Sequence, residues 1–345
     1  MPFREPEYTG NIQRMTYLSD IEGLIAGRQA ESESARDRFM ADYPAGIEEK
    51  RSRYLDMLGW PLSARREDTP GPRMETTLIG ADGDADIFRV SLETLPGFRF
   101  GGILFRQRGD SPRPLVISVH GGLGTPEFVA GFYRGGDTAN YNDMTGRLLA
   151  RGVHVFAPQL LLWNQETYHI HYDRQAIDNA LKQLDSSITA LEVHALMGAI
   201  GALAAETWVD EARIGIAGLS YGGFYALFTA AADPRIKSCV AAGFFNDRIR
   251  HNWLDWTWKG AAQTFLDAEV GALVAPRGLH LQLGKRDELF AEQPARAEYL
   301  RLERYYARAG RPDKLSMEFF DGTHEFSRSE ETIDSLMNDL DWHGR

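Results

Sequence analysis

The chain has 345 residues, of which 43% are hydrophobic and 25% are charged, the composition of a globular protein with a sizeable core. Its formal net charge of −11 at pH 7 argues against general binding to nucleic acids, because their phosphates would be repelled rather than neutralised. The one cysteine, Cys239, excludes an intrachain disulfide framework and a zinc site made of several cysteines.

Residues 1–70 are predicted to form a helical extension with mixed charges. The helical pattern is broken at Tyr43-Pro44 and ended by Gly59 and Pro61. We expect one face of these helices to pack against the core or against a neighbouring subunit, and the second case would make the protein a homo-oligomer. The apolar residues expected on that face are Leu24, Ile25, Phe39, Ile47, Leu55 and Leu58.

The first residues, MPFREPEYTGNIQRM, lack the apolar core of a secretion signal. No stretch of the chain approaches the ~20 apolar residues that a membrane-spanning helix needs. The sequence therefore predicts a cytoplasmic protein with no membrane partner.

Residues 71–345 are predicted to form a second domain, which begins after the loop SARREDTPGP. Its first three stretches, TTLIG, DIFRVSLET and FRFGGILFRQ, are typical of antiparallel strands at one edge of a sheet. From Pro114 onward, short buried strands alternate with helical stretches, as in PLVISVHGG followed by YNDMTGRLLARG. This alternation predicts an α/β domain, in which helices cover both faces of a mostly parallel sheet.

The stretch GIAGLSYGGFYALF places Ser220 between a predicted buried strand and a predicted helix, with Gly218 and Gly222 two positions to either side. A serine whose hydroxyl stands clear of the backbone needs a tight turn, in which side chains at those two positions would collide with neighbouring backbone. Ser220 is therefore a candidate nucleophile. The N–H of Tyr221, at the start of the helix, is a candidate donor to an oxyanion.

Candidate partners for this nucleophile follow two later strands. Asp287 lies in the loop after LHLQLG, and His324 lies in the loop after LSMEFF. Reactive groups of such sheets gather at the carboxyl ends of the strands, and the chain order serine, aspartate, histidine accompanies a nucleophile in a strand–turn–helix. Asp247, after the preceding strand, and Asp321, near His324, are the alternative acids.

With these features, residues 75–340 resemble the α/β-hydrolase superfamily. More narrowly, VISVHGGLG, GLSYGG and YLDMLGWP resemble the carboxylesterases related to dienelactone hydrolase and acetyl xylan esterase, a group with a helical N-terminal extension. The resemblance implies the α/β-hydrolase fold. True dienelactone hydrolases have a cysteine as nucleophile, whereas this chain has Ser220, so the resemblance does not extend to that activity.

The resemblance also implies roles for loop residues. It gives the first oxyanion donor as the N–H of Gly122 or Leu123 and the second as that of Tyr221, and we expect His120 to brace the loop around Gly122. Leu123 is also a candidate pocket residue. Four tryptophans in loops after strands are expected either to line a substrate pocket or to pack a cap against the sheet, namely Trp163, Trp253, Trp256 and Trp258.

Together these residues predict a serine carboxylesterase that hydrolyses a small or medium acyl ester, such as an acetylated carbohydrate, through an acyl-enzyme. A serine peptidase or acyltransferase on the same fold, and a catalytically silent binding protein, are the alternatives. The chemistry needs no metal and no organic cofactor. DGDADIFRVSLE imitates a calcium loop without its glycine at the sharp bend, and His169 and His171 lack an evident third ligand, so neither stretch predicts a metal site.

Overall fold

The computed structural model describes residues 1–64, 73–133 and 139–343. Its centre is a nine-stranded sheet with the strand order β1-β2-β3-β5-β4-β6-β7-β8-β9. The first three strands pair antiparallel at one edge, and the strands from β4 to β9 run parallel to one another. The strands are β1 (Arg73–Asp82), β2 (Ala85–Leu95), β3 (Phe98–Gln107), β4 (Arg113–Val119), β5 (His154–Pro158), β6 (Val209–Leu219), β7 (Ile236–Ala242), β8 (Gly278–Gly284) and β9 (Leu315–Phe320).

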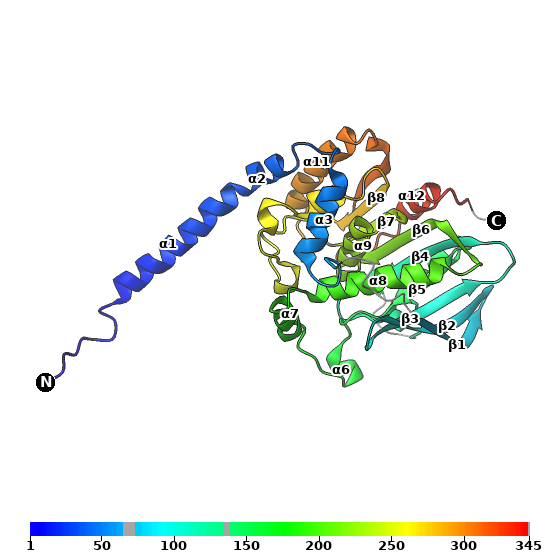
Figure 1. The fold of residues 1–345 in the computed structure, drawn as a ribbon, viewed down its shortest axis with the longest axis horizontal. Coiled ribbons are helices and arrows are strands. Elements are labelled where there is room, and N and C mark those ends of the chain that lie inside the picture. Colours follow the sequence, from blue (N-terminus) through cyan, green and yellow to red (C-terminus); the bar gives the residue numbers. More distant parts are fainter. Residues whose placement is uncertain (65–72, 134–138, 344–345) are drawn as a thin grey trace.

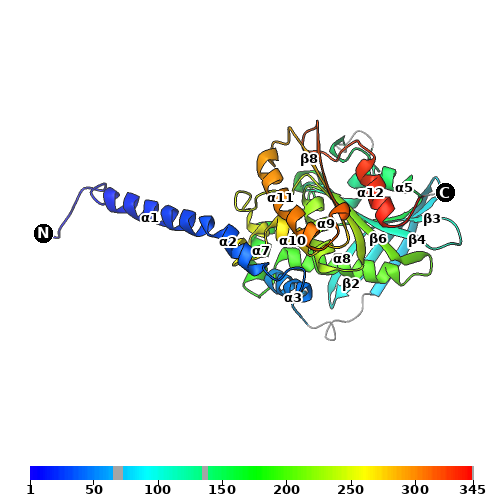
Figure 2. The ribbon, with the colours of Figure 1, turned by 90° about the horizontal axis from the view of Figure 1, so that it is seen from above.

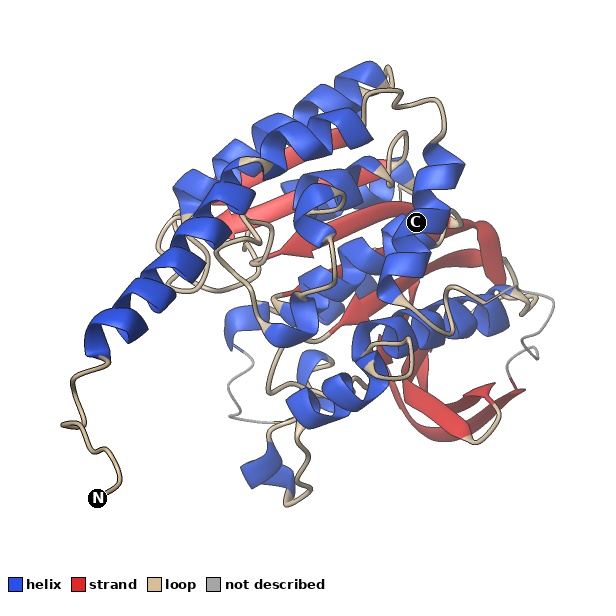
Figure 3. Ribbon diagram, turned by 60° about the vertical axis from the view of Figure 1, so that its left-hand side comes forward, coloured by secondary structure: helices blue, strands red, loops and turns tan. Residues whose placement is uncertain are grey.

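Helices cover both faces of this sheet, as the sequence predicts (Figure 3). Because side chains alternate along a strand, Leu115 and Ile117 of β4 belong to the core on one face and Val116 to the core on the other. The first face carries α8 (Ile188–Ala204), α9 (Tyr221–Ala232), α10 (Asp267–Ala272) and α11 (Glu292–Arg308), and the second carries α4 (Pro126–Val129), α5 (Met144–Leu149) and α12 (Glu331–Asp339). Two further short helices are α6 (Gln165–Tyr168) and α7 (Arg174–Lys182).

The N-terminal extension contains three helices, α1 (Asn11–Ala30), α2 (Ser32–Phe39) and α3 (Ile47–Leu58). α3 ends at Gly59, whose φ of 97° suits only glycine, so the predicted end of the helical pattern is confirmed. α2 and α3 pack on the body, whereas α1 projects away from it and buries none of its residues (Figures 1 and 2). The predicted boundary at residues 70 and 71 lies outside the described residues.

The expected packing of the extension is therefore correct for only part of it. Leu58 is buried, and Phe39, Ile47 and Leu55 pack against the core. Leu24 and Ile25 are not buried, because they only line an open groove beside the body and remain 68% and 51% exposed. No described helix combines the length and the apolar character that crossing a bilayer requires.

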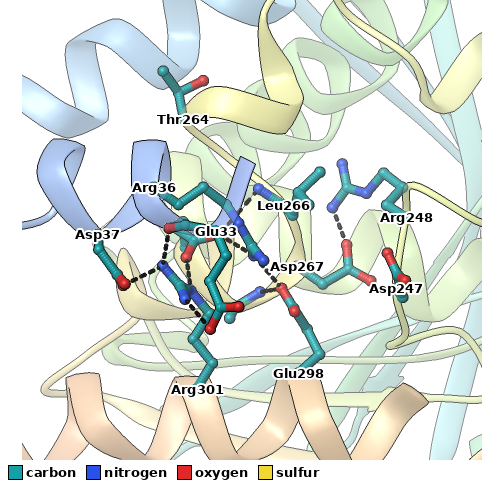
Figure 4. Close-up of polar contacts among 12 residues, drawn as sticks. Glu33, Arg36, Asp37, Asp247, Arg248, Thr264, Leu266, Asp267, Glu298 and Arg301 are labelled. Carbon is teal, nitrogen blue, oxygen red and sulfur yellow. Dashed lines mark hydrogen bonds and ion pairs between the residues drawn. The ribbon is translucent and has the colours of Figure 1, made fainter. Parts of the chain in front are cut away.

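Buried ion pairs fix α2 to the body (Figure 4). The Arg36 guanidinium of α2 donates to Glu269 of α10 at 2.9 Å and to Glu298 of α11 at 2.8 Å. Arg301 of α11 donates to Glu269 at 2.6 Å and reaches back to Asp37 of α2 at 2.6 Å. Removing one member of such a buried network leaves an unpaired charge and typically lowers the free energy of unfolding by about 3–5 kcal/mol. The network therefore fixes α2, and with it the end of α1 that adjoins α2.

This network has an expected pH dependence. Burial, reinforced by repulsion from Glu269, raises the pKa of Glu298 from its ordinary 4.5 to about 7. The folded protein then holds this proton more tightly than the unfolded chain does, so its stabilising contribution is complete below the unfolded pKa and is lost as pH rises through the folded one. We expect the wild type to lose roughly 3 kcal/mol of unfolding free energy as pH rises from the unfolded pKa to the folded one, and we expect Glu298→Gln to lack this loss.

Urea unfolding of the wild type and the Glu298→Gln variant on either side of this pH range measures the difference. The other titrating groups are common to both proteins, so they cancel in the comparison. Parallel pH profiles would show that Glu298 carries no such proton.

Candidate active site

Ser220 lies in a sharp turn between β6 and α9. Its φ of 59° is in the region that residues with a side chain seldom adopt, which marks a strained turn. A Cβ on Gly218 would lie 2.2 Å from the carbonyl oxygen of Gly222, and a Cβ on Gly222 would lie 2.1 Å from that of Val119. Both positions therefore require glycine for a physical reason, and the turn directs Ser220 to the carboxyl end of the sheet.

His324 and Asp287 meet at the same end of the sheet. The Nδ1 atom of His324 lies 2.8 Å from Oδ2 of Asp287, whose side chain is completely buried. The other carboxylate oxygen of Asp287 accepts the N–H groups of Leu289 at 2.8 Å and Phe290 at 3.0 Å. With both oxygens engaged, the carboxylate has a fixed orientation, and a proton on Nδ1 leaves Nε2 of His324 free to accept another.

The His324 ring lies beside the residues that flank Ser220. The Ser220 N–H donates to the carbonyl oxygen of Ala242 at 2.8 Å, and a Cβ built on the next residue, Gly243, would lie 3.3 Å from Cε1 of His324. Among the described residues, no hydrogen bond joins the Ser220 hydroxyl to His324. Such contacts are often long in free enzymes and shorten when substrate binds.

The alternative carboxylates have other partners. Asp247 accepts the N–H of Ile249 at 3.0 Å and pairs with Arg250 at 3.3 Å. Asp321 pairs with Arg286 on the surface. Within the described chain, neither carboxylate contacts His324.

The two candidate oxyanion donors lie close together, one at the start of α9 and the other in the loop after β4. Tyr221 is the first residue of α9, and the first N–H groups of a helix have no partner inside it. Gly122 follows β4 and packs closely on the Tyr221 ring, since a Cβ on it would lie 3.5 Å from a ring carbon. The neighbouring N–H, that of Gly121, is already donated to the Tyr141 hydroxyl at 2.7 Å. The backbone of Leu123 pairs with that of Trp163 in a short parallel β-bridge, and Leu123 is 67% exposed.

His120 joins the loop after β4 to the loop after β5. Its Nδ1 lies 2.8 Å from the carbonyl oxygen of Gly121, and its Nε2 accepts the N–H of Leu160 at 3.1 Å. Complete burial lowers the pKa of His120 to about 4, so the ring is neutral at pH 7 and can hold both bonds with one proton. Its geometry is that of a brace between two loops.

The tryptophans of the site differ in exposure. Trp253 is 36% exposed and stacks on the Tyr221 ring with centroids 5.7 Å apart. Trp163 packs edge-on against Tyr172 and donates its indole N–H to the carbonyl oxygen of Ile170. Trp256 is only 2% exposed and stacks on Phe224 at 4.8 Å. The expectation that Trp256 offers a surface to substrate is therefore corrected, because its rings are covered by the core of the cap.

A buried polar network behind Ser220 was not foreseen from the sequence. The Tyr221 hydroxyl donates to Asp255 at 3.0 Å, and Asp255 pairs with Arg174 of α7 at 2.8 Å. Arg174 also donates to Tyr225 at 2.7 Å and pairs with Glu192 of α8 at 3.2 Å. The one sequence signal was Glu192, a single carboxylate in the apolar helix ITALEVHALMGAIGALA, where a charge needs a buried partner.

Candidate ligands in both stretches that imitate metal sites are exposed. Asp82 is exposed at the end of the edge strand β1, and His169 and His171 are exposed around the end of α6. No group of three metal-ligating side chains occurs among the residues that the structure describes.

Comparisons with known proteins agree on the fold. Residues 129–253 match the model of the dienelactone hydrolase family. A provisionally assigned acetyl xylan esterase from Bacteroides fragilis superposes with a TM-score of 0.66 at 14% identity, over 79% of this chain and 74% of that one. Acetyl xylan esterase 1 from Thermoanaerobacterium sp. superposes with a TM-score of 0.58 at 15% identity, over 87% of this chain and 95% of that one. A glucuronoyl esterase from Solibacter usitatus superposes with a TM-score of 0.63 at 13% identity, over 87% of this chain and 93% of that one. No curated protein sequence matches the chain significantly.

Proposed function

We propose that this chain, which has the fold of its α/β-hydrolase neighbours and matches the dienelactone hydrolase family over residues 129–253, is a serine carboxylesterase. The observation that carries the proposal is the pairing of His324 with the buried Asp287 beside the turn that holds Ser220. A nucleophile, a base and a group that orients the base are what acyl transfer to serine requires.

The proposed reaction follows from these positions. His324 Nε2 removes the proton from Ser220 as its oxygen attacks the ester carbonyl, and Asp287 stabilises the imidazolium that forms. The N–H groups of Tyr221 and Gly122 donate to the oxyanion. His324 then returns the proton to the departing alcohol, which leaves an acyl-serine. A water molecule, deprotonated by the same imidazole, hydrolyses this intermediate to the acid and free enzyme.

A cysteine nucleophile does not fit this chain. Its one cysteine, Cys239, is completely buried in β7, and burial raises the pKa of its thiol well above the ordinary value. A buried protonated thiol is a poor nucleophile. The proposed reaction is therefore that of a serine enzyme, even though the matching family takes its name from an enzyme with a cysteine.

We further propose an ester of a carbohydrate as the substrate. The structural neighbours include acetyl xylan and glucuronoyl esterases by name, which motivates the choice. Trp253 supports it from this chain, because a partly exposed indole beside the residue after the nucleophile suits the flat apolar face of a sugar ring.

Two tryptophan variants test the sugar proposal. We expect Trp253→Ala to raise KM about 5- to 10-fold for an acetylated sugar and much less for p-nitrophenyl acetate, whose small groups need no platform. Trp256→Ala is the matched control. It should lower the melting temperature, because truncating a buried tryptophan costs about 3–5 kcal/mol, and should affect both esters equally.

Steady-state kinetics on the two esters, with an aminoacyl-arylamide as a third substrate, gives the comparison. If Trp253→Ala lowered activity equally on both esters, Trp253 would not be a contact for the sugar ring, and the esterase proposal would still stand. Cleavage of the arylamide in preference to the esters would contradict the esterase proposal itself and favour a peptidase.

A further inference from the structure

One face of α1 carries an apolar stripe that no described residue buries. Its members are spaced so that they share one side of the helix. The least exposed is Ile21 at 38% and the most exposed is Tyr17 at 71%. The stripe, as we use the term below, consists of Tyr17, Leu18, Ile21, Leu24 and Ile25.

A groove lies where the stripe meets the body. Leu24 and Ile25 form one wall, and residues of the segment 248–266, among them Ile249, Trp256 and Leu266, form the other. The groove has a volume of about 520 Å³.

The position of this surface is fixed. Glu31, the residue between α1 and α2, has helical backbone angles, so the two helices follow each other without a flexible loop. α2 is in turn held by Arg36 among its buried carboxylates. A helix anchored in this way presents its stripe at a constant place and orientation.

We propose that α1 of a second copy of this chain covers the stripe and enters the groove, with the two helices antiparallel. A symmetric dimer requires a surface that fits itself, and a stripe on a projecting helix meets this requirement. With the twofold axis between residues 19 and 20, Leu18 of each copy lies against Ile21 of the other, and Tyr17 lies near Leu24.

The charges on α1 favour the antiparallel direction. In a parallel pair, Arg14 would face Arg14 and Glu22 would face Glu22. In the antiparallel pair, Arg14 of one copy lies within one helical turn of Glu22 of the other, so the like charges separate and opposite charges approach. Two stripes together bury on the order of 1,000 Å², the lower size limit of specific interfaces.

The first half of α1 gives the groove its occupant. Ile12 and Met15 are 78% and 71% exposed and lie on a different side of the helix from the stripe. In the antiparallel pair, residues 11–15 of the second copy run along Leu24 and Ile25. The stripe side of this segment then faces α1 of the first copy. Ile12 and Met15 of the second copy point toward the other wall of the groove, which includes Trp256 of the first copy.

Mass measurement of the full chain in solution, by sedimentation or light scattering, tests the dimer. We expect twice the 38.7 kDa of one chain at micromolar concentration. Ile21→Glu should reduce the mass to that of a monomer, because it places a charge in the apolar interface, while the matched change Thr16→Glu, away from the stripe, should leave a dimer. A monomeric wild type, or a dimer that Ile21→Glu does not disturb, would overturn the proposal.

Cysteine crosslinking tests the direction. Residues 14 and 25 are about 16 Å apart along a helix, too far for a disulfide within one chain, and the native Cys239 is buried. The double variant Arg14→Cys/Ile25→Cys should form a covalent dimer under oxidation, whereas each single variant should not. Crosslinking of the single variants would show a parallel pair. A monomer that instead binds phosphatidylcholine vesicles through Ile21 would show that lipid covers the stripe.

Discussion

Replacing Ser220 with alanine is expected to lower kcat for ester hydrolysis by a factor on the order of 10⁴ or more while leaving the melting temperature nearly unchanged. The hydroxyl is the proposed nucleophile, and no other side chain of the site supplies one. It makes no hydrogen bond to another described residue, so its removal leaves no buried group unpaired. A serine-directed fluorophosphonate should label the wild type and fail to label the variant.

Ser118 provides the matched control for this experiment. It is also a serine near the carboxyl end of a central strand, it is completely buried, and its hydroxyl is bonded to Thr145 at 2.8 Å. Ser118→Ala should therefore cost about 1–2 kcal/mol of stability and retain activity. Full activity in the Ser220→Ala variant would end the acyl-enzyme proposal.

Asp287→Asn is expected to lower kcat by a factor of about 10²–10⁴ with little loss of stability. The amide oxygen of asparagine can still accept the N–H groups of Leu289 and Phe290, so the loop keeps its bonds. The amide nitrogen, however, is a donor where His324 Nδ1 needs an acceptor. The ring then carries its proton on Nε2, where the base must accept one from Ser220.

Asp247→Asn is the control, because Asp247 pairs with Arg250 and not with His324. It should leave kcat within a few-fold of the wild type. If Asp247→Asn produced the large loss and Asp287→Asn did not, the proposed acid would be wrong. Equal kcat/KM for the wild type and both variants would show that no carboxylate is needed to orient His324.

The sequence predicted the domain well where local patterns decide the structure. The antiparallel strands before Pro114 and the strand–helix alternation after it are confirmed, because two-residue and helical periodicities reflect burial directly. The projecting α1 was not predicted. Its apolar spacing is that of any packed amphipathic helix, and the sequence does not say whether the partner surface belongs to the same chain.

The candidate site was predictable to a similar extent. The turn around Ser220 follows from glycines that no other residue can replace sterically. The sequence named Asp287 as the acid and kept Asp247 as an alternative, because both follow strands and only the three-dimensional path brings one of them to His324. The role of Trp256 was unpredictable for the same reason, since exposure depends on Phe224, which lies far from it in the chain.

In the proposed mechanism, the bond between Tyr221 and Asp255 links turnover to selectivity. Tyr221 offers its backbone N–H to the proposed oxyanion and uses its side chain to hold Asp255, which lies between Trp253 and Trp256. The loop that is proposed to contact the substrate is thus bonded to the residue that is proposed to stabilise the transition state. We therefore expect a mutation of Trp253, which is partly exposed, to change the substrate range with little loss of reaction rate. A mutation of Asp255, which is buried, would change the range and slow the reaction as well.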